Sequence, residues 1–425
     1  MTGTDPMRDR PRTVVVTGAG LVTALGIGKA DNWQALVNGR SGVRRIRRFS
    51  TAGLKVGIAA SVDAVTAEPP TATNLCHAFA THAIEEALAE AAIGPRGRFP
   101  GPLYLAVPPL ELDWSQRIRL AQATGRGEEL VYDDLLRAAA TGAFSDLDEQ
   151  CEHGAVATRL QAAYGTRGAP VSLNTACASG ATTIQLGVEA IRRGDTDAAL
   201  CVGTDSSVNP ETLIRFSLLT ALSMRDDVPE TVSRPFARSR DGFVMGEGAA
   251  ALVLESLHSA RARGAPILGI VSGVGETVDR FHRTRPSPGG GPVAACMGHA
   301  LRDACLAPDA IGYINAHGTG TPENDRTEYL GIAAVMGGRD IAVSSSKSMI
   351  GHTLSAAGAI EAVITLLALR AQRLPPTINY RDPDPEIPLD VVPNVARDAR
   401  VAHALSNAFG FGGQNVSLVL SHPDA

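Results

Sequence analysis

Short apolar runs alternate with helical patterns along the first half of the chain. The apolar runs, typical of buried strands, lie at Thr13–Thr17, Leu103–Val107, Pro170–Ala176 and Ala198–Thr204. Apolar residues at helical spacing predict helices at Asn32–Asn38, Cys76–Ala92 and about Ala178–Arg193. Between Leu110 and Gln150 the sequence is long and charged, which predicts helices and loops on a surface.

A second series of the same kind begins after the Ala- and Arg-rich helix predicted at Glu255–Arg263. Its predicted elements are strands at Pro266–Val274, Ile311–Ala316, Ile341–Ser345, Ala402–Phe409 and Asn415–Leu420, and helices at Val293–Cys305 and Leu354–Arg373. Apolar strands that alternate with helices predict an α/β fold with helices on both sheet faces. Because residues 13–258 and 266–425 carry similar series without a linker, we expect two halves around one central interface.

Composition narrows the class of protein. The chain has 425 residues, of which 44% are hydrophobic and 20% are charged, so disordered and fibrous classes are excluded. A net charge of −5 argues against a nucleic-acid partner. Apolar stretches such as Ala362–Leu369 fall short of a membrane span, and the charged N-terminus lacks a signal core. We therefore predict a cytoplasmic protein without a membrane span.

Two rare residue types, cysteine and lysine, include candidates for catalytic side chains. The six cysteines are scattered without a C-x-x-C pair, which favours neither a disulfide framework nor a zinc site. Only three residues are lysines against a large excess of arginine, so Lys347 stands where this chain otherwise uses arginine. This hints at a need for a compact ammonium group, although chance would also place a lysine somewhere.

Cys177 follows a predicted strand and precedes a predicted helix. At a helix N-terminus, free N–H groups and the helix dipole favour a thiolate, which predicts a lowered pKa. Its neighbours Ala176, Ala178, Ser179 and Gly180 are small and permit a tight turn and the close approach of an acyl chain. The residues alone leave open a buried structural cysteine.

Three further blocks combine histidine, lysine and glycine. They are INAHGTGTPENDRTE (314–328) with His317, SSSKSMIGHTLSAAGAIE (344–361) with Lys347 and His352, and SNAFGFGGQN (406–415). The hydroxyls of Thr319 and Thr321 suit a polar, amide-bearing ligand arm, and the Gly-rich turn can aim N–H groups at an oxyanion. Taken singly, each histidine could also be a polar residue with satisfied hydrogen bonds, and each turn only a turn.

Other catalytic and binding motifs are excluded because each lacks a residue that it requires. The segment VTGAGLVTALG has Thr23 where a dinucleotide loop needs glycine, and no tyrosine has lysine four residues later. Ser344-x-x-Lys347 matches a penicillin-binding motif, but no K-T-G exists. No serine lies in G-x-S-x-G, and a metal site at His317 and His352 would need a carboxylate or cysteine. We therefore predict no metal site.

Taken together and in this order, the four blocks resemble the β-ketoacyl-acyl-carrier-protein synthases, type II condensing enzymes of the thiolase superfamily. RPFARSRDGFVMGEGA (234–249) and VVVTGAGLVTALG near the start also match. The resemblance implies a thiolase-like α/β fold with duplicated β/α halves in a five-layered αβαβα core. Residues 13–258 would carry the nucleophilic cysteine, and residues 266–425 the two histidines.

The resemblance also implies roles for single residues. Cys177 would accept the acyl group, His317 and His352 would drive decarboxylation of malonyl-carrier protein, Lys347 would support them electrostatically, and Glu328 would be the acidic partner of Lys347. Phe411 would act as a gate whose backbone N–H completes an oxyanion hole with that of Cys177. Thr319 and Thr321 would contact the phosphopantetheine arm, together with the turn residues Phe409, Gly410 and Gly412.

The implied reaction is a decarboxylative Claisen condensation that gives a 3-oxoacyl-carrier protein in fatty acid or polyketide biosynthesis. It needs no cofactor beyond the phosphopantetheine of the acyl carrier protein, and the implied assembly is a homodimer or a heterodimer with a ketosynthase-like subunit. HGTGT is the more polyketide-like form of its block. Region 105–150 departs from the family, since it lacks the usual glycine-rich stretch, which leaves acyl chain length open.

Two alternatives and one surface feature stay open. A non-catalytic, chain-length-determining partner subunit would lack the nucleophile, whereas this chain has Cys177. A degradative thiolase would have a second cysteine near its C-terminus, whereas the last one here is Cys305. The basic tract Arg44–Arg48 is either a docking patch for an acidic carrier protein or a segment that contacts its own chain.

Overall fold

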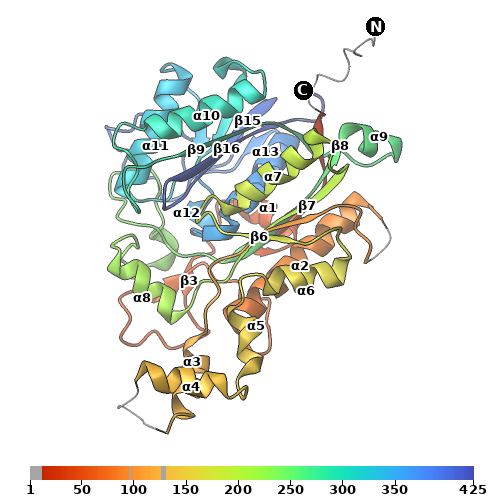
Figure 1. Ribbon diagram of the computed structural model, residues 1–425. Coiled ribbons are helices and arrows are strands. Elements are labelled where there is room, and N and C mark those ends of the chain that lie inside the picture. Colours follow the sequence, from red (N-terminus) through yellow and green to blue (C-terminus); the bar gives the residue numbers. More distant parts are fainter. Residues whose placement is uncertain (1–11, 95–96, 126–130) are drawn as a thin grey trace.

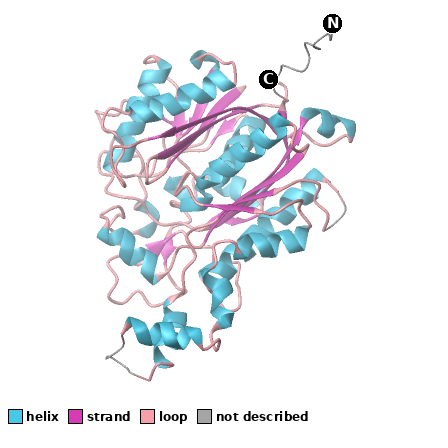
Figure 2. Cartoon of the chain, viewed as in Figure 1, coloured by secondary structure: helices cyan, strands magenta, loops and turns pink. Residues whose placement is uncertain are grey.

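The computed structural model describes residues 12–94, 97–125 and 131–425, and these build five alternating layers of helices and strands (Figure 1). In order, the layers contain α10 (Gly291–Asp303) and α11 (Pro322–Met336); β9 (Gly269–Val278), β15 (His403–Phe409) and β16 (Gln414–Ser421); α7 (Ser179–Arg193) and α13 (Ala357–Ala371); β1 (Val14–Thr23), β7 (Ala198–Asp205) and β8 (Gly248–Ser256); and α2 (Ala72–Ala91) and α6 (Ala155–Tyr164). This is the predicted αβαβα order, and Figure 2 shows the two strand layers with helices between and outside them.

The two strand layers are joined at one place. Within the described residues, twelve strands form one sheet in the order β13-β11-β10-β15-β16-β9-β1-β8-β7-β5-β6, with β2 beside β1. β1 and β9 pair only from Val14 to Val16. Because this pairing is so short, the layers diverge from it and enclose α7 and α13. The division into halves at residues 258–266 stays a prediction.

The remaining strands and helices are short or peripheral. They are β2 (Gly26–Ile27), β5 (Leu103–Ala106), β6 (Val171–Leu173), β10 (Ile311–Asn315), β11 (Ala342–Ser344), β13 (Asp390–Val391), the pairs β3 (Arg44–Arg45) with β4 (Ile58–Ala59) and β12 (Arg373–Leu374) with β14 (Arg397–Asp398), and α1 (Lys29–Val37), α8 (Pro210–Leu218), α9 (Leu257–Ala262) and α12 (Lys347–Ile350). Most predicted elements lie within a few residues of these bounds. β8 was missed by the sequence prediction.

The central helix α13 corrects one expectation. The 18-residue window Leu354–Ala371 is apolar and long enough to cross a membrane, with a mean hydropathy of 1.6, so the expectation that no stretch reaches that length is wrong. However, 83% of the window is buried inside the protein. A helix covered by strand layers on both sides is apolar all round, which accounts for the composition.

The first strand is longer than predicted, because its glycines do not end it. A Cβ atom on Gly18 would lie 2.0 Å from the carbonyl oxygen of Ala87, and one on Gly20 would lie 1.9 Å from that of Ala83. Both carbonyls belong to α2. The two glycines therefore let the helix backbone pack directly against β1, and the strand continues to Thr23.

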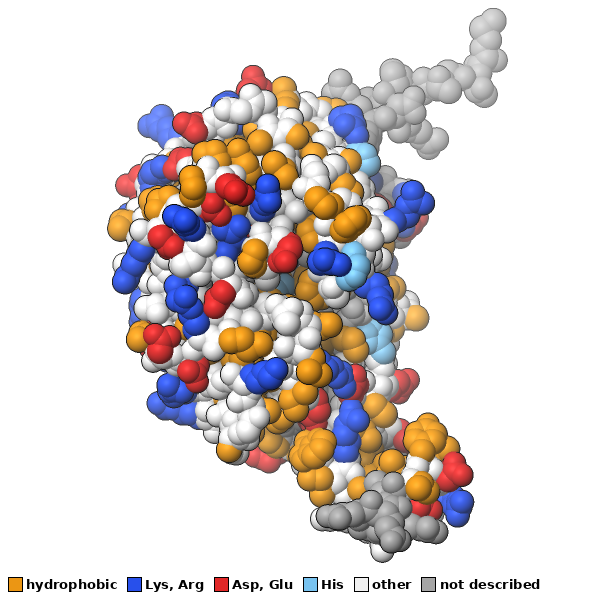
Figure 3. Space-filling model, turned by 90° about the vertical axis from the view of Figure 1, so that its left-hand side faces the viewer, with side chains coloured by type: hydrophobic (Ala, Val, Ile, Leu, Met, Phe, Trp, Pro, Cys, Tyr) orange, Lys and Arg blue, Asp and Glu red, His pale blue; other side chains and the backbone are white. Residues whose placement is uncertain are grey.

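The charged stretch 110–150 forms surface helices as predicted, outside residues 126–130, which are not among the described residues. α3 (Trp114–Gln122), α4 (Tyr132–Ala140) and α5 (Asp148–Cys151) project from the layered body (Figure 1). Hydrophobic side chains gather on this projection (Figure 3), among them Trp114, Tyr132 and Leu136, which are 59%, 72% and 49% exposed.

The basic tract 44–48 lies against its own chain. Arg48 forms a bidentate ion pair with Glu247, a fully buried carboxylate, at 2.8 and 2.6 Å. Arg44 and Arg45 each have a carboxylate of the same chain at 3.5 Å. These contacts favour the structural interpretation of the tract over a docking patch, since three of its four charges already have partners.

Candidate active site

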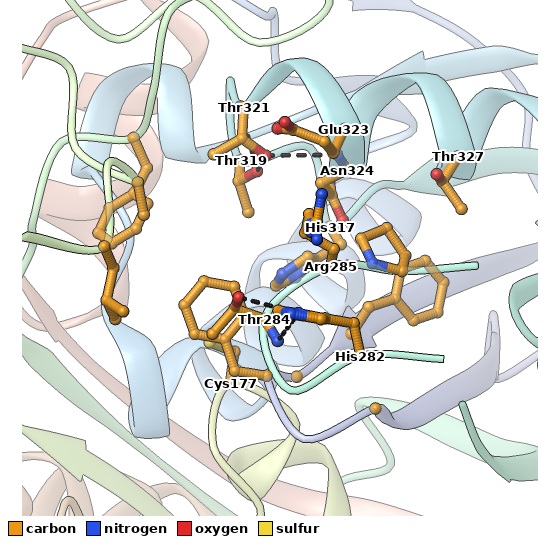
Figure 4. Close-up of a pocket in the computed structure, with 18 of the residues that line it drawn as sticks. Cys177, His282, Thr284, Arg285, His317, Thr319, Thr321, Glu323, Asn324 and Thr327 are labelled. Atoms are coloured by element: carbon orange, nitrogen blue, oxygen red, sulfur yellow. Dashed lines mark hydrogen bonds between the residues drawn. The ribbon is translucent and has the colours of Figure 1, made fainter. Parts of the chain in front are cut away.

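A cavity of about 370 Å³ brings together residues that lie far apart in the sequence. Its size is within the range of small-molecule sites. The predicted site residues that line it are Cys177, His317, Thr319, Thr321, His352, Phe409, Gly410 and Phe411. Figure 4 shows Cys177 across the cavity from Thr319 and Thr321, with His317 between them.

Cys177 lies on a sharp bend between β6 and α7. Ala176 has a φ of +49°, which is unusual for a residue with a side chain and is typical of strained functional sites. Hydrogen bonds hold the bend: the side chain of Asn174 accepts from the Ala176 N–H at 2.9 Å, and Ser179 Oγ accepts from the Thr175 N–H at 2.8 Å. The predicted strand–cysteine–helix arrangement is therefore present, with a shorter strand.

The predicted lowering of the thiol pKa is wrong. Burial raises the pKa of Cys177 to about 11, although the charge of Lys347 and a hydrogen bond from the backbone N–H of Phe411 act in the opposite direction. The helix N-terminus alone does not compensate for removing the thiolate from water. The resting thiol is therefore protonated at neutral pH, and acyl transfer must include the departure of this proton.

The two histidines form a neutral pair. Their ring centres are 5.3 Å apart and their planes are inclined by 83°. Burial lowers the pKa of both rings well below 6.5, and the charge of Lys347 adds to the effect. Both imidazoles therefore stay uncharged at neutral pH.

Hydrogen bonds fix which nitrogen of each ring carries the proton. Lys347 Nζ lies 3.4 Å from Nδ1 of His317, and the Leu354 N–H donates to Nδ1 of His352 at 3.3 Å. An ammonium and an amide N–H are donors, so both Nδ1 atoms accept. The ring protons are then on Nε2, and the cavity has two neutral Nε2–H donors.

Lys347 is 1% exposed and pairs with Glu361 of α13. The predicted pairing of Lys347 with Glu328 is therefore wrong. Glu328 accepts hydrogen bonds from the backbone N–H groups of His317 and Gly318, both at 2.8 Å. Glu328 therefore positions the loop after β10. The carboxylate that pairs with the Lys347 ammonium is that of Glu361 on α13.

Glu361 was missed in the sequence, although a signal exists. It is the one charged residue in the run AGAIEAVITLLAL, within a helix that is buried on all sides. A charge at such a position needs a buried partner. Lys347 is 14 residues earlier in the same sequence block, and it supplies that partner.

The Gly-rich turn between β15 and β16 closes over Cys177. The ring of Phe411 packs against that of Phe216, with ring centres 6.4 Å apart. A Cβ atom on Gly410 would lie 2.8 Å from the Thr175 carbonyl oxygen and 3.3 Å from the Cys177 nitrogen, so only glycine fits there. Gly412 is not part of the cavity wall; it has a φ of +84° and donates its N–H to the Arg283 carbonyl at 2.7 Å. We expect Gly412 to shape the turn.

Thr319 and Thr321 line the cavity together with His317. Their hydroxyls are 2.9 Å apart, and Thr321 also caps α11 by accepting from the Asn324 N–H. The ring of Phe409 lies with its centre 5.7 Å from that of His317. These residues line the same cavity as Cys177.

Family models match most of the chain. The model for the N-terminal domain of β-ketoacyl synthase matches residues 11–96 and 111–260, and that for the C-terminal domain matches residues 268–381. The chain belongs to the β-ketoacyl synthase family. The break in the first match at residues 97–110 lies at the start of the region that departs from the family pattern.

Two curated β-ketoacyl synthases and a solved structure agree with this assignment. A 3-oxoacyl-[acyl-carrier-protein] synthase 2 of Coxiella burnetii is 39% identical, covering 96% of this chain and 98% of the relative. The tetracenomycin polyketide synthase ketoacyl synthase alpha subunit of Streptomyces glaucescens is 35% identical, covering 98% of both. A type II polyketide synthase ketosynthase, bound to the hexaketide and in complex with its acyl-carrier protein, superposes with a TM-score of 0.85 at 32% identity, over 97% of this chain and 100% of that one.

These relatives confirm the predicted enzyme class and fold. The chain is a condensing enzyme of the acyltransferase type with a thiolase-like fold. The roles of individual site residues stay predictions that the geometry constrains. The arrangement supports the roles predicted for Cys177, His317, His352 and Lys347. The ion-pair partner of Lys347 is Glu361 in place of the predicted Glu328.

Proposed function

We propose that this β-ketoacyl synthase condenses an acyl group held on Cys177 with malonyl-acyl carrier protein, releases CO₂ and gives a 3-oxoacyl-carrier protein. The observation that carries the proposal is the placement of one cysteine and two neutral Nε2–H imidazoles on the walls of one cavity. A non-catalytic partner subunit would need none of this arrangement. A thiolase would need a second cysteine near the C-terminus, which the sequence lacks.

The acyl transfer begins when the Cys177 sulfur attacks the thioester carbonyl of the acyl-carrier protein. A new C–S bond forms, the bond to the carrier sulfur breaks, and the thiol proton goes to the departing carrier thiolate. Both Nδ1 lone pairs are already occupied, so neither imidazole is a ready base for this proton. The backbone N–H groups of Cys177 and Phe411 would stabilise the oxyanion.

The condensation then uses the histidines as donors. The bond between Cα and the carboxylate of the malonyl group breaks, CO₂ leaves, and negative charge moves onto the thioester oxygen. The two Nε2–H groups stabilise that enolate charge. Its carbanion attacks the acyl carbon on Cys177, the C–S bond breaks, and the cysteine leaves as a thiolate. No step requires the imidazoles to be charged.

We also propose that the substrates arrive on the phosphopantetheine of an acyl carrier protein and that the enzyme works as a dimer in the cytoplasm. Similarity to both a 3-oxoacyl-carrier-protein synthase and a polyketide ketoacyl synthase alpha subunit is compatible with either pathway and with either a homodimer or a heterodimer. Intact-mass measurement with a panel of acyl-carrier-protein thioesters tests the proposal. One acyl adduct per chain supports it, and no adduct with any thioester contradicts it.

Glu361 makes a pH profile predictable. Burial raises the pKa of Glu361 to about 7 against the opposing charge of Lys347, and burial also raises the pKa of Glu328 to about 7. As the pH falls through about 7, protonation of Glu361 removes the ion pair, so the rate of malonyl decarboxylation should fall. The histidines, neutral on both sides of this pH, do not cause that change.

The variant Glu361→Gln imitates the protonated state. Its decarboxylation rate at pH 8 should be below that of the wild type, and the acid limb should disappear or move down by about one pH unit, because the two carboxyls titrate together. A rate measurement between pH 5.5 and 9 checks this. An acid limb with the wild-type midpoint in the variant would show that Glu361 does not control the step.

Phe411→Ala should uncouple decarboxylation from condensation. The ring lines the cavity beside Cys177, and its removal opens the site to malonyl-carrier protein before the acyl group is loaded. The ratio of CO₂ released to 3-oxoacyl product should rise several-fold. Phe216→Ala should give a smaller rise, because it removes the packing of the same ring. A ratio that stays at the wild-type value in both variants would contradict a gate at Phe411.

A further inference from the structure

The loop between β9 and α10 forms one wall of the cavity and carries several positive charges. It contains Arg280, Arg283 and Arg285, all exposed, and we refer to these three residues as the arginine triplet. Arg283 and Arg285 line the cavity together with His282 and Thr284. In Figure 4, His282 and Thr284 of this loop lie on the side of the cavity opposite Thr319 and Thr321.

The backbone of this loop is firmly held even though the arginine heads are exposed. The carboxylate of Asp279 accepts from the N–H groups of Phe281 and Ser287 at 2.9 and 2.7 Å, and from the Ser287 hydroxyl at 2.7 Å. The Asp279 N–H donates to the Gly413 carbonyl at 2.7 Å, in the turn that also carries Phe411. The backbone that carries Arg283 and Arg285 therefore has a fixed place at the cavity, and Arg280 lies outside the lining residues.

The triplet has no anionic partner in the described part of the chain. None of its guanidinium groups is within ion-pair distance of a described carboxylate, in contrast to Arg48, whose charge is matched by Glu247. Asp279 uses its carboxylate within the loop. Glu323 is the other acidic residue among those that line the cavity, and it forms no ion pair with the triplet. A cluster of unmatched arginines at a cavity is suited to an anionic ligand.

We propose that Arg283 and Arg285 of the arginine triplet bind the phosphate of the phosphopantetheine arm and thereby make the enzyme select phosphorylated thioesters. This inference rests on the proposed function, which brings such an arm to Cys177. Guanidinium groups recognise phosphate oxygens with parallel hydrogen bonds, which a single ammonium does not do. Because the guanidinium groups are exposed, salt screens their charge. They should therefore lower the KM at low salt more than they change kcat.

The test compares two small malonyl thioesters that differ only in the phosphate: malonyl-phosphopantetheine and malonyl-pantetheine. Wild-type enzyme should have a kcat/KM for decarboxylation about tenfold higher with the phosphorylated compound, mostly through KM. In the double variant R283Q/R285Q this ratio should fall to about one. The matched control R400Q, at an exposed arginine outside the cavity wall, should keep the wild-type ratio.

The outcomes separate three possibilities. A ratio that is unchanged in R283Q/R285Q overturns the phosphate site. A ratio that is unchanged while the KM for malonyl-carrier protein rises shows that the arginines contact the protein surface of the carrier, which also overturns it. If wild-type enzyme decarboxylates neither compound nor malonyl-carrier protein, the proposed function itself fails. Circular dichroism and thermal melting confirm that the variants fold.

Discussion

Replacement of Cys177 by alanine is expected to abolish acyl transfer and condensation. The covalent intermediate needs a sulfur at this position, and removal of a nucleophile costs on the order of 10⁴-fold or more in rate. The fold should persist, because the change deletes one buried sulfur atom in a small-residue bend. Condensation rates and intact mass after incubation with acyl-carrier protein measure the effect.

The exposed cysteines provide the control. Cys151→Ala and Cys305→Ala should keep the wild-type rate, since neither residue lines the cavity. Cys177→Ala should show no acyl adduct. Condensation at the wild-type rate in Cys177→Ala, or an adduct on another cysteine, would refute the assignment of the nucleophile.

His317→Ala and His352→Ala are expected to separate the two half-reactions. Each imidazole offers one Nε2–H donor to the enolate oxygen, and the loss of one such donor typically costs about 10²–10³ in rate, or about 3–4 kcal/mol. Malonyl decarboxylation should therefore fall by that factor in each variant. Acylation of Cys177 should persist, because neither ring has a free lone pair to serve as its base.

Lys347 should affect the same step. Lys347→Ala removes the donor to Nδ1 of His317, so decarboxylation should fall, and Lys347→Arg should restore little because a planar guanidinium does not fit a buried point-charge site. His258→Ala, on the exposed helix α9, is the matched control and should keep the wild-type rate. Normal decarboxylation in either catalytic-histidine variant would make that histidine structural.

Local patterns were enough to predict the layers and most of the site. The position of Cys177 between a strand and a helix depends on neighbours within a few residues. The position of His317 directly after a strand does so too. The order of the four blocks carried the family resemblance, which then implied roles for these residues. The carboxyl ends of the neighbouring parallel strands β10, β11 and β15 lie at one edge and bring His317, Lys347 and Gly410 together there, whereas Cys177 follows β6 in the other strand layer.

Other features depend on contacts between distant segments, and there the sequence was insufficient. The partner of Lys347 is decided by how α13 packs beside α12, which puts Glu361 at the ammonium in place of Glu328. The pKa of Cys177 depends on burial by several segments, which outweighs its helix. The glycines of β1 resemble a turn in sequence, and only the approach of α2 reveals their packing role.

A single-turnover experiment tests the central claim most directly. Wild-type enzyme is first acylated with acyl-carrier protein, the adduct is mapped by peptide mass spectrometry, and malonyl-carrier protein is then added. We expect one adduct per chain, on Cys177, whose disappearance matches the release of CO₂ and the formation of a 3-oxoacyl-carrier protein with the acyl group extended by a two-carbon unit. An adduct on another residue, or an adduct on Cys177 that persists while product forms, would contradict the account.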